Sequence, residues 1–394
     1  MTQQVEFDVV VIGGGPSGAT SATDLARAGR RVLLIDKMGR IKPCGGAIPP
    51  RLMREFEIPE SLLTARISAA RMVAPSQRHV DIPIEGGFVG MVDREVFDPW
   101  LRERAAAAGA HCCTGTFLRL ERDQCEGVIV HFRTDEKSEP ASVRARLVIG
   151  ADGARSEVAR QEIAAAKDRA NVFAYHEVIR TPAVGAVDPA RCEVIYDAAI
   201  SPDFYGWSFP HGATLSVGTG SCEKGFSQRQ AVAQLRQRLG LGDAQTLRRE
   251  GAPLPMRPLG KWDNGKDVIL AGDAAGVVAP ASGEGIYYAM LGGRLAAQAA
   301  AVFLDTGRAR SLGLARRRFM RSHGLVFWIL GIMQRFWYRS DERRERFVAI
   351  CRDADVQRLT FEAYMNKRLV RARPLAHVRI LLKDVAHLMG MVSP

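Results

Sequence analysis

A glycine-rich turn between an apolar strand and a helix constrains the fold of this 394-residue chain more than any other feature. The apolar run Phe7–Ile12 predicts a buried parallel strand, and Ser17–Ala28 predicts a helix. In such a unit the first glycine permits the turn, the second lets backbone approach a pyrophosphate, and the third lets helix and strand pack closely. We therefore expect dinucleotide phosphates at the helix N-terminus. The expected binding residues are Gly13, Gly15, Pro16, Ser17 and Gly18.

An acid follows at the spacing that a dinucleotide site requires. Asp36 ends the second predicted strand, Arg31–Ile35, and lies 23 residues after Gly13. A carboxylate near this spacing binds the hydroxyls of an unphosphorylated adenosine ribose, as in FAD or NAD. We expect Asp36 and the adjacent Lys37 to bind the cofactor. A glycine-rich turn without a ligand is the structural alternative.

Two later signatures indicate which dinucleotide is bound. Asp152 and Gly153 follow the apolar run Leu147–Ile149, and Gly272-Asp273 follows Val268–Ala271. In their order and flanking strands these motifs resemble the FAD-dependent family built on the aromatic-hydroxylase fold. The resemblance implies that Asp152 helps to form the FAD site and that Gly272-Asp273 binds the ribityl chain. A carboxylate suits ribityl hydroxyls because it accepts several hydrogen bonds.

The same resemblance adds further cofactor-binding residues. Gly283, Gly285 and Ile286 stand at the start of a predicted long helix, whose N-terminal dipole would stabilise negative charge on a reduced flavin. Arg94 aligns with the family position that contacts the FAD phosphates. The alternative for Arg94 is an ordinary surface arginine.

Two blocks carry a closer resemblance to the geranylgeranyl reductase branch of that family. They are Lys42–Pro49, which contains Pro-Cys-Gly-Gly-Ala-Ile-Pro, and Tyr205–Pro210. The branch members most similar in these blocks reduce the geranylgeranyl tail of chlorophyll or bacteriochlorophyll to phytyl. The resemblance covers roughly residues 5 to 310. It implies NADPH as the electron donor, with reduced ferredoxin as an alternative, and chlorophyll synthase as a partner.

Candidate catalytic and substrate-binding residues lie in these two blocks. The family places Cys44 beside flavin and substrate, where a thiol would donate a proton or orient the chain; the alternative is a cysteine that only packs. Tyr205, Trp207 and Phe209 alternate, so on a strand they share one face that would line the tail and stabilise a developing cation. An ordinary sheet core is the alternative there. We expect Cys44, Tyr205 and Trp207 to be catalytic and Gly45, Gly46 and Phe209 to bind substrate. His211 and Tyr196 are weaker acid candidates.

The motif order predicts an α/β fold with a discontinuous, Rossmann-type FAD-binding domain, an antiparallel-sheet substrate domain and a helical C-terminal region. The FAD-binding domain is expected over 1–65, 92–165 and 266–308, and the substrate domain over 66–91 and 166–265. Residues 309–394 are expected to form the C-terminal region, which is the candidate for membrane contact. Seven cysteines without paired Cys-x-x-Cys spacing argue against a disulfide scaffold and predict no metal site.

The net charge and the distribution of arginines bear on the location of the protein in the cell. Lys plus Arg is 55 against 43 acids, a net charge of +12. Between Arg308 and Arg346 eleven arginines and three acids are interleaved with apolar and aromatic residues, which suits either a membrane interface or a basic helix that covers the FAD-binding domain. With no apolar run long enough to span a bilayer and no signal peptide, we expect a cytoplasmic protein, peripheral on the inner or photosynthetic membrane. No nucleic-acid module is recognisable.

Other functions stay open at this stage. Free geranylgeranyl diphosphate and isoprenoid ether lipids present the same double bonds as a pigment ester. An FAD-dependent aromatic monooxygenase would use the same scaffold but would require oxygen. A non-catalytic carrier of isoprenoid pigments would keep the aromatic groups without turnover.

Overall fold

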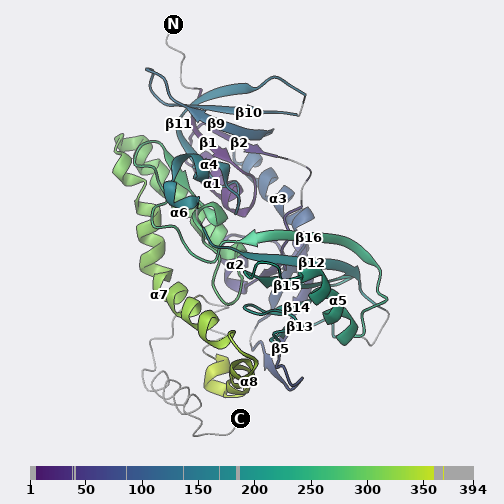
Figure 1. Ribbon diagram of the computed structural model, residues 1–394. Coiled ribbons are helices and arrows are strands. Elements are labelled where there is room, and N and C mark those ends of the chain that lie inside the picture. The colour runs from purple at the N-terminus through teal and green to yellow at the C-terminus, as the bar shows by residue number, and fades with distance from the viewer. Residues whose placement is uncertain are drawn as a thin grey trace. The chain divides into compact units, whose positions relative to one another are not determined.

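The computed structural model describes residues 6–37, 39, 41–85, 87–135, 137–167, 169–182, 187–358 and 367. The chain forms two compact units, each assembled from three segments (Figure 1). The first unit comprises residues 1–42, 94–171 and 253–329, and the second comprises 43–93, 172–252 and 330–394. No helix in the described ranges is both long and apolar enough to cross a membrane.

The first unit is built on a seven-stranded sheet with the order β8-β2-β1-β11-β10-β9, in which β17 also pairs with β11. Strands β8, β2, β1, β11 and β17 pair in parallel, whereas β10 pairs antiparallel with β11 and β9. The central strands read as continuous apolar runs because both faces are covered. Their bounds are β1 Phe7–Ile12, β2 Val32–Asp36, β8 His111–Thr114, β9 Thr116–Glu121, β10 Val128–Arg133, β11 Ala141–Gly150 and β17 Val268–Leu270.

Helices α1 and α6 of this unit approach each other closely. A Cβ built on Gly293 of α6 would lie 2.2 Å from the backbone oxygen of Ser17 in α1, so the small residue permits the crossing. The helices of this unit are α1 Pro16–Arg27, α3 Arg94–Ala107, α4 Glu157–Glu162 and α6 Ile286–Thr306, with short 3₁₀ turns η2 Ala164–Ala166, η3 Gly272–Ala275 and η4 Ala309–Ser311. Helix α7, Leu314–Trp337, begins here and continues into residues of the second unit.

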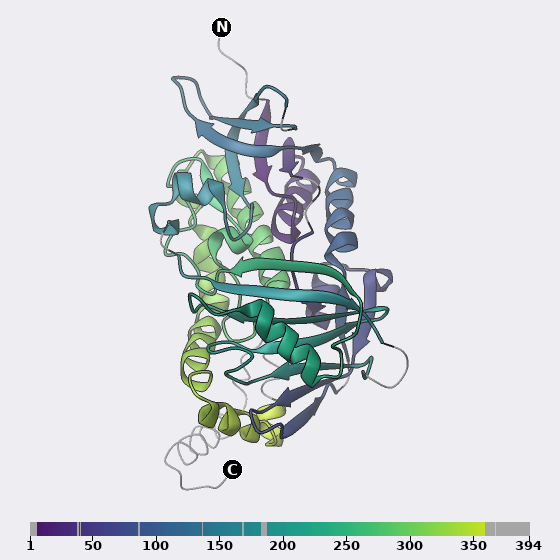
Figure 2. The same cartoon turned by 45° about the vertical axis from the view of Figure 1, so that its right-hand side comes forward.

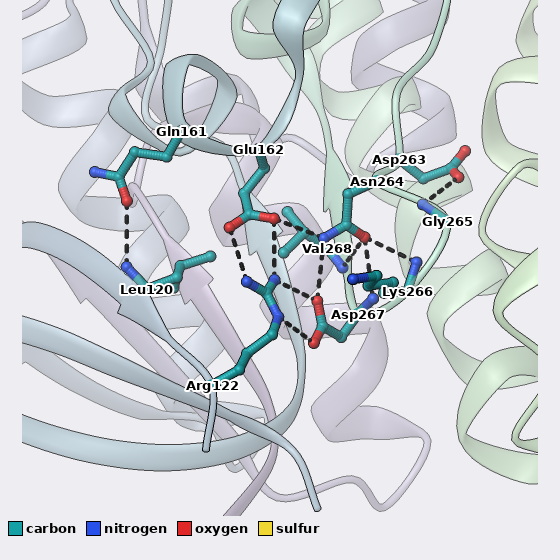
Figure 3. Close-up of polar contacts among 10 residues, drawn as sticks. All are labelled: Leu120, Arg122, Gln161, Glu162, Asp263, Asn264, Gly265, Lys266, Asp267 and Val268. Carbon is teal, nitrogen blue, oxygen red and sulfur yellow. Dashed lines mark hydrogen bonds and ion pairs between the residues drawn. The ribbon is translucent and has the colours of Figure 1, made fainter. Parts of the chain in front are cut away.

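An arginine ties three separate segments of the first unit together (Figure 3). Arg122, just after β9, donates to both oxygens of Glu162 at the end of α4 and to both oxygens of Asp267 before β17. Asn264 orders the turn before β17, since its side-chain oxygen accepts from the backbone N–H groups of Lys266, Asp267 and Val268 at 3.0 Å. These contacts hold β17, and therefore the residues that follow it, in register with β11.

The second unit is built on another seven-stranded sheet with the order β16-β12-β15-β14-β13-β5-β6. The pair β13–β5 is parallel, and the pairs with a described register elsewhere in this sheet are antiparallel. A three-stranded sheet, β3-β7-β4, belongs to the same unit. The bounds are β3 Ala47–Ile48, β4 Leu63–Ile67, β5 Ala69–Val73, β6 His79–Pro83, β7 Val89–Val92, β12 Val172–Arg180, β13 Arg191–Ile195, β14 Gly206–His211, β15 Thr214–Ser221 and β16 Thr246–Leu254.

Helix α5, Gln228–Arg238, covers one face of this sheet (Figure 2). Val232 and Leu235 on its apolar stripe are buried against residues of β12, β13 and β15. Helix α8, Asp341–Ile350, is fixed by the fully buried Arg344, whose guanidinium donates to the backbone oxygens of Ser201, Pro202 and Tyr338. The remaining short elements are α2 Pro50–Glu55 and η1 Glu60–Leu62.

The α/β fold class that the motif order predicts is confirmed, with a mostly parallel sheet in one unit and a mostly antiparallel sheet in the other. The unit boundaries differ from the expected domain limits in several places. Residues 43–65 group with the second unit because β3 and β4 pair with β7. Residues 166–171, 253–265 and 309–329 group with the first unit, and those from 330 on group with the second. Helices α7 and α8 occupy the described part of the expected C-terminal region. Residues 359–366 and 368–394 of that region lie outside the described residues.

Candidate functional site

The turn between β1 and α1 is held by backbone contacts that leave no room for larger residues. The N–H of Gly13 donates to the Ile35 carbonyl at 2.8 Å. A Cβ built on Gly18 would lie 1.8 Å from the carbonyl oxygen of Gly13, well inside any real contact. The turn therefore requires glycine at position 18, where the sequence predicts close packing of helix and strand.

This turn is open on the side of Gly15, and the hydroxyl of nearby Ser17 has no hydrogen-bond partner among the described residues. A Cβ on Gly15 would meet nothing closer than Arg94 Nη2 at 4.0 Å. Pro16 stands at the start of α1, where a missing N–H costs nothing. The hydroxyl of Ser17 is buried and has no hydrogen-bond partner within the part of the chain that the structure describes. The first-turn N–H groups of α1 point into the same region.

Asp36 lies at the end of β2 and contacts the glycine turn directly. Its Oδ1 accepts from the N–H of Gly14 at 2.8 Å, and Arg102 of α3 lies 3.2 Å from Oδ2. Burial raises the pKa of Asp36, opposed by the Gly14 N–H and Arg102. Lys37, the next residue, is exposed. Sequence reasoning found Asp36 but not Arg102, which sits mid-helix among several arginines and has no motif of its own.

Arg94 begins α3 and is almost fully buried, not a surface residue. It makes a two-pronged ion pair with Asp98 one helical turn later, at 2.6 and 2.7 Å. This pair fixes the guanidinium on the side of Gly15, where an anion would be bound.

Asp152 has a structural role that the sequence did not indicate. Its carboxylate accepts from Ser156 Oγ and from the backbone N–H groups of Glu157 at 2.7 Å and Val158 at 3.2 Å, at the N-terminus of α4. Burial raises the pKa of Asp152, against these hydrogen bonds. Both carboxylate oxygens are thus engaged by α4.

Asp273 lies in η3 and is buried beside the start of α6. Its Oδ2 is 2.5 Å from Lys42 Nζ, and a Cβ on Gly285 would lie 3.9 Å from Oδ1. Gly272, with φ +63°, packs against the Ser17 side chain, so the Gly272-Asp273 motif and the glycine turn adjoin. Gly283 adopts φ +65° in the loop that leads to Gly285, the N-cap of α6, and to the buried Ile286.

Arg169 joins two of the sequence signatures and was not anticipated. It donates to the backbone oxygens of Asp273 at 2.9 Å, of Ala274 at 3.1 Å, and of Ala154. The loop after β11 and the turn η3 are thereby held together. No local pattern marks this arginine, since its partners are backbone atoms far away in the sequence.

In the second unit, the loop around Cys44 packs against the end of β14. The half-buried Cys44 Sγ lies 3.4 Å from the N–H of Gly46. A Cβ on Gly45 would lie 3.1 Å from the ring of Phe209. His211 Nε2 lies 3.1 Å from the Gly45 carbonyl oxygen. The two sequence blocks that carry the closer resemblance are therefore in contact.

Tyr205, Trp207 and Phe209 form one row of rings, as alternation along a strand predicts. The ring centroids of Tyr205 and Trp207 are 6.1 Å apart, and those of Trp207 and Phe209 are 6.2 Å apart. Tyr205 also stacks on Phe204 and contacts Tyr196. Tyr205 and Trp207 are buried and Phe209 is half-buried. Burial also raises the pKa of Tyr196 well above its usual value, so its phenol is a weak acid.

A row of hydrogen-bonded side chains next to Trp207 was not predicted from the sequence. Trp207 Nε1 donates to Ser216 Oγ at 3.1 Å, and Ser216 Oγ lies 2.9 Å from His176 Nδ1. His176 Nε2 lies 3.0 Å from Glu250 of β16. Because indole nitrogen only donates, the serine oxygen accepts from it and the serine hydroxyl can donate to His176. These hydrogen bonds fix the orientation of the Trp207 ring.

Comparison with known proteins agrees with this arrangement. Residues 6–316 match a family described as FAD binding domain. The chain is 57% identical over 391 residues to the geranylgeranyl diphosphate reductase of Rhodobacter capsulatus, covering 99% of each protein. It is 35% identical to the chloroplastic geranylgeranyl diphosphate reductase of Oryza sativa subsp. japonica, covering 96% of this chain and 86% of that one. The chain belongs to the geranylgeranyl reductase family.

A solved structure shares the fold of this geranylgeranyl reductase family member. It is a geranylgeranyl bacteriochlorophyll reductase-like protein from Thermoplasma acidophilum, 23% identical, with a TM-score of 0.79. The match covers 94% of this chain and 99% of that one. The family assignment makes the protein an FAD-dependent oxidoreductase.

The residues of the first unit fit FAD. The buried Ser17 hydroxyl, which has no hydrogen-bond partner among the described residues, and the open side of Gly15 form a cradle suited to a diphosphate, with Arg94 alongside. Asp36 of β2 contacts the turn at Gly14, and Asp273 of η3 follows Gly272, which packs against Ser17, so two carboxylates adjoin this cradle. Asp152 fits a supporting role, since its oxygens already bind α4.

Proposed function

We propose that this protein reduces isolated double bonds in the geranylgeranyl tail of chlorophyll or bacteriochlorophyll to give the phytyl tail. The observation that carries reduction of the geranylgeranyl tail is the similarity, over 99% of the chain, to a geranylgeranyl diphosphate reductase. A chloroplast relative and the name of the Thermoplasma protein favour a pigment ester as substrate. The names of the sequence relatives favour free geranylgeranyl diphosphate, which is the main alternative.

In this proposal the first unit is the FAD-binding domain. Gly13, Gly15, Pro16, Ser17 and Gly18 would hold the diphosphate with Arg94, and Asp36 and Lys37 would hold the adenosine ribose. Gly272, Asp273, Gly283, Gly285 and Ile286 would hold the ribityl chain and the ring. When bound in reduced form, FAD supplies a hydride to one carbon of the double bond.

The second unit supplies the substrate residues. An isolated double bond has no conjugated carbonyl to accept electrons, so the other carbon must receive a proton from an acid. Tyr205, Trp207 and Phe209 present a row of ring faces that would bind an apolar tail and stabilise positive charge. Cys44 precedes Gly45, which packs against the ring of Phe209. Its Sγ would donate the proton or orient the isoprenoid tail.

The source of electrons is part of the proposal. NADPH is the favoured donor, and reduced ferredoxin is the alternative because a basic protein suits an acidic carrier. Mixing the oxidised protein anaerobically with NADPH, and separately with reduced ferredoxin, would distinguish them by the loss of flavin absorbance. Chlorophyll synthase is proposed as a partner that would supply or receive the pigment ester.

Peripheral membrane contact is proposed for helix α7, because the substrate tail is lipophilic. The residues Arg321, Leu325, Trp328, Ile332 and Arg335 follow one another at spacings of three or four, so they form one stripe along the helix. All five are exposed, Trp328 to 64%. The helix contains no acid. An apolar centre between arginines matches an anionic bilayer surface.

The substrate is tested by competition. Geranylgeranyl-bacteriochlorophyll and geranylgeranyl diphosphate are offered together at equal concentration, without oxygen, and the ratio of kcat/KM is read from product masses. Preference for the pigment supports the proposal. Preference for the diphosphate would make free geranylgeranyl diphosphate the substrate instead of the pigment ester. Product that forms only in air would favour an aromatic-type monooxygenase, and bound pigment of unchanged mass would favour a carrier.

A further inference from the structure

His211 ends strand β14 and joins it to the backbone of the Cys44 loop. Its Nε2 lies 3.1 Å from the Gly45 carbonyl oxygen, and its Nδ1 lies 3.3 Å from Thr64 Oγ1. A carbonyl oxygen only accepts, so Nε2 carries the proton and donates to Gly45. In the neutral ring Nδ1 is then an acceptor that faces the Thr64 hydroxyl, whose single proton is also within reach of the Met91 carbonyl oxygen at 3.1 Å.

Thr64 is placed for this contact by an irregularity in the three-stranded sheet. The pairing of β4 with β7 shifts register between Leu63 and Ala65, which is the position of Thr64. Such a bulge redirects a side chain out of the regular alternation. Behind it the fit is tight, since a Cβ on Gly212 would lie 2.8 Å from the Thr64 carbonyl oxygen.

The loop itself is clamped from two sides at Gly46. This residue has φ +74°, and a Cβ there would lie 2.4 Å from the Val92 carbonyl oxygen and 2.5 Å from His211 Cε1. Its own carbonyl accepts from the Val92 N–H at 2.9 Å. Glycine is therefore required for the loop to lie between β7 and the histidine ring.

The surroundings keep the histidine ring neutral. Burial lowers the pKa of His211 to about 4, although the hydrogen bond to Gly45 acts in the opposite direction. At neutral pH the ring therefore has one donor, which binds the Gly45 carbonyl oxygen, and one acceptor, which faces the Thr64 hydroxyl of β4. The neutral ring is therefore not the acid that protonates the substrate.

We propose that His211 is a positioning residue that fixes the backbone at Gly45 and thereby the direction of the Cys44 thiol. The neutral ring connects the Cys44 loop to the Thr64 bulge, so the loop is set by β14 and β4 together. The effect on turnover rests on the proposed function of Cys44. The effect on the loop does not.

The test measures the chemical accessibility of Cys44. Wild type, His211→Phe, His211→Gln and the exposed-site control His79→Gln are labelled with N-ethylmaleimide, and the rate at Cys44 is read by peptide mass relative to the exposed Cys112. Phenylalanine fills the space but cannot donate, and we expect Cys44 to react about tenfold faster, roughly the effect of losing one buried hydrogen bond. The glutamine amide can still donate to Gly45. We expect His211→Gln and the control to stay within about twofold of wild type.

A second variant covers the case in which His211→Phe does not fold. Thr64→Val keeps the β-branched shape and removes the hydroxyl that contacts both Nδ1 and the Met91 carbonyl oxygen. We expect labelling to rise by about threefold. Unchanged Cys44 labelling in folded His211→Phe, or equal acceleration in His211→Gln, overturns the proposal. In the reductase assay kcat should fall in His211→Phe while KM stays near wild type. Absence of turnover in every protein, with the labelling pattern as expected, counts against the proposed function and leaves the positioning role supported.

Discussion

The two glycine-rich turns of this protein, Gly13–Gly18 in the first unit and Cys44–Gly46 in the second, are held by different kinds of contact. In the first turn Gly13 and Gly18 are enclosed by backbone atoms: those of Ile35 in β2, of Ala151 just after β11 and of the turn itself. In the second turn Gly46 lies against the Val92 backbone, but Gly45 is held by the side chains of Phe209 and His211. These come more than 160 residues later, as the 166-residue separation of Gly45 and His211 shows. Backbone enclosure follows from the fold, whereas side-chain enclosure must be specified residue by residue.

The largest effect is expected where backbone encloses a glycine. Gly18→Ala would place a methyl group 1.8 Å from the Gly13 carbonyl oxygen. We expect FAD binding to weaken by about a hundredfold, because backbone cannot move aside without displacing α1. Flavin absorbance retained after gel filtration measures it. Gly260→Ala is the matched control, since nothing lies within 4 Å of its added Cβ. Normal flavin content in Gly18→Ala would show that the turn is not the phosphate site.

The second effect is on stability in acid and arises in the second unit. The pKa of His211 is about 4 in the fold, against 6.5 when exposed, because of burial. The unfolded chain therefore takes up this proton first, so stability is complete above pH 6.5 and is lost as pH falls toward 4. The loss should be about 3 kcal/mol. Asp93 opposes the low pKa, whereas His176 and Arg248 favour it.

Urea unfolding at pH 7 and at pH 4.5 measures this loss. His211→Gln does not titrate, so its free energy of unfolding should fall by less over the same interval. An identical pH dependence in the two proteins would mean that another group accounts for acid instability.

The third effect separates ring packing from hydrogen bonding at the aromatic row. Trp207→Phe keeps an aromatic face but loses the bond to Ser216, and it should cost about 1 kcal/mol of stability beyond the loss of volume. Turnover should fall about tenfold if ring orientation matters. Trp262→Phe is the control, because Trp262 is buried and its Nε1 has no hydrogen-bond partner among the described residues. Equal turnover in both variants would remove Trp207 from the substrate site.

The smallest effect concerns the α7 stripe. Trp328→Ala should weaken binding to vesicles that contain anionic lipid by about fivefold, since part of one large apolar side chain no longer enters the interface. Cosedimentation measures it, and flavin content should not change. Phe173→Ala, which removes another exposed aromatic side chain, should bind as wild type does. If both variants bind equally well, α7 is not the membrane-facing element.

The contrast between the two turns also explains what the sequence could predict. The strand, turn and helix around Gly13–Gly18, and the position of Asp36, follow from local spacing and are present in the structure. The alternation of Tyr205, Trp207 and Phe209 likewise predicts a shared face. These features depend on the chain's near neighbours or on strand periodicity.

Residues that act across the chain could not be predicted in that way. Arg169 binds backbone oxygens of two remote loops, and Ser216 and His176 matter only because β15 and β12 pair beside β14. Thr64 faces His211 because of a bulge, which no turn residue announces. Asp152 was expected in the cofactor site, and its hydrogen bonds to α4 depend on how the loop after β11 folds back, which the sequence does not indicate.

The central claim is that the first unit holds FAD while Cys44 and the aromatic row of the second unit serve reduction of the tail. Wild type and Cys44→Ala, both loaded with FAD and reduced with dithionite, are incubated without oxygen with geranylgeranyl-bacteriochlorophyll, and the products are weighed by mass spectrometry. We predict that the wild-type product gains hydrogens in steps of two and ends at the phytyl ester, whereas Cys44→Ala keeps its flavin and loses most of this conversion. An unchanged substrate mass with fully reduced wild-type protein, or full conversion by Cys44→Ala, would contradict the account.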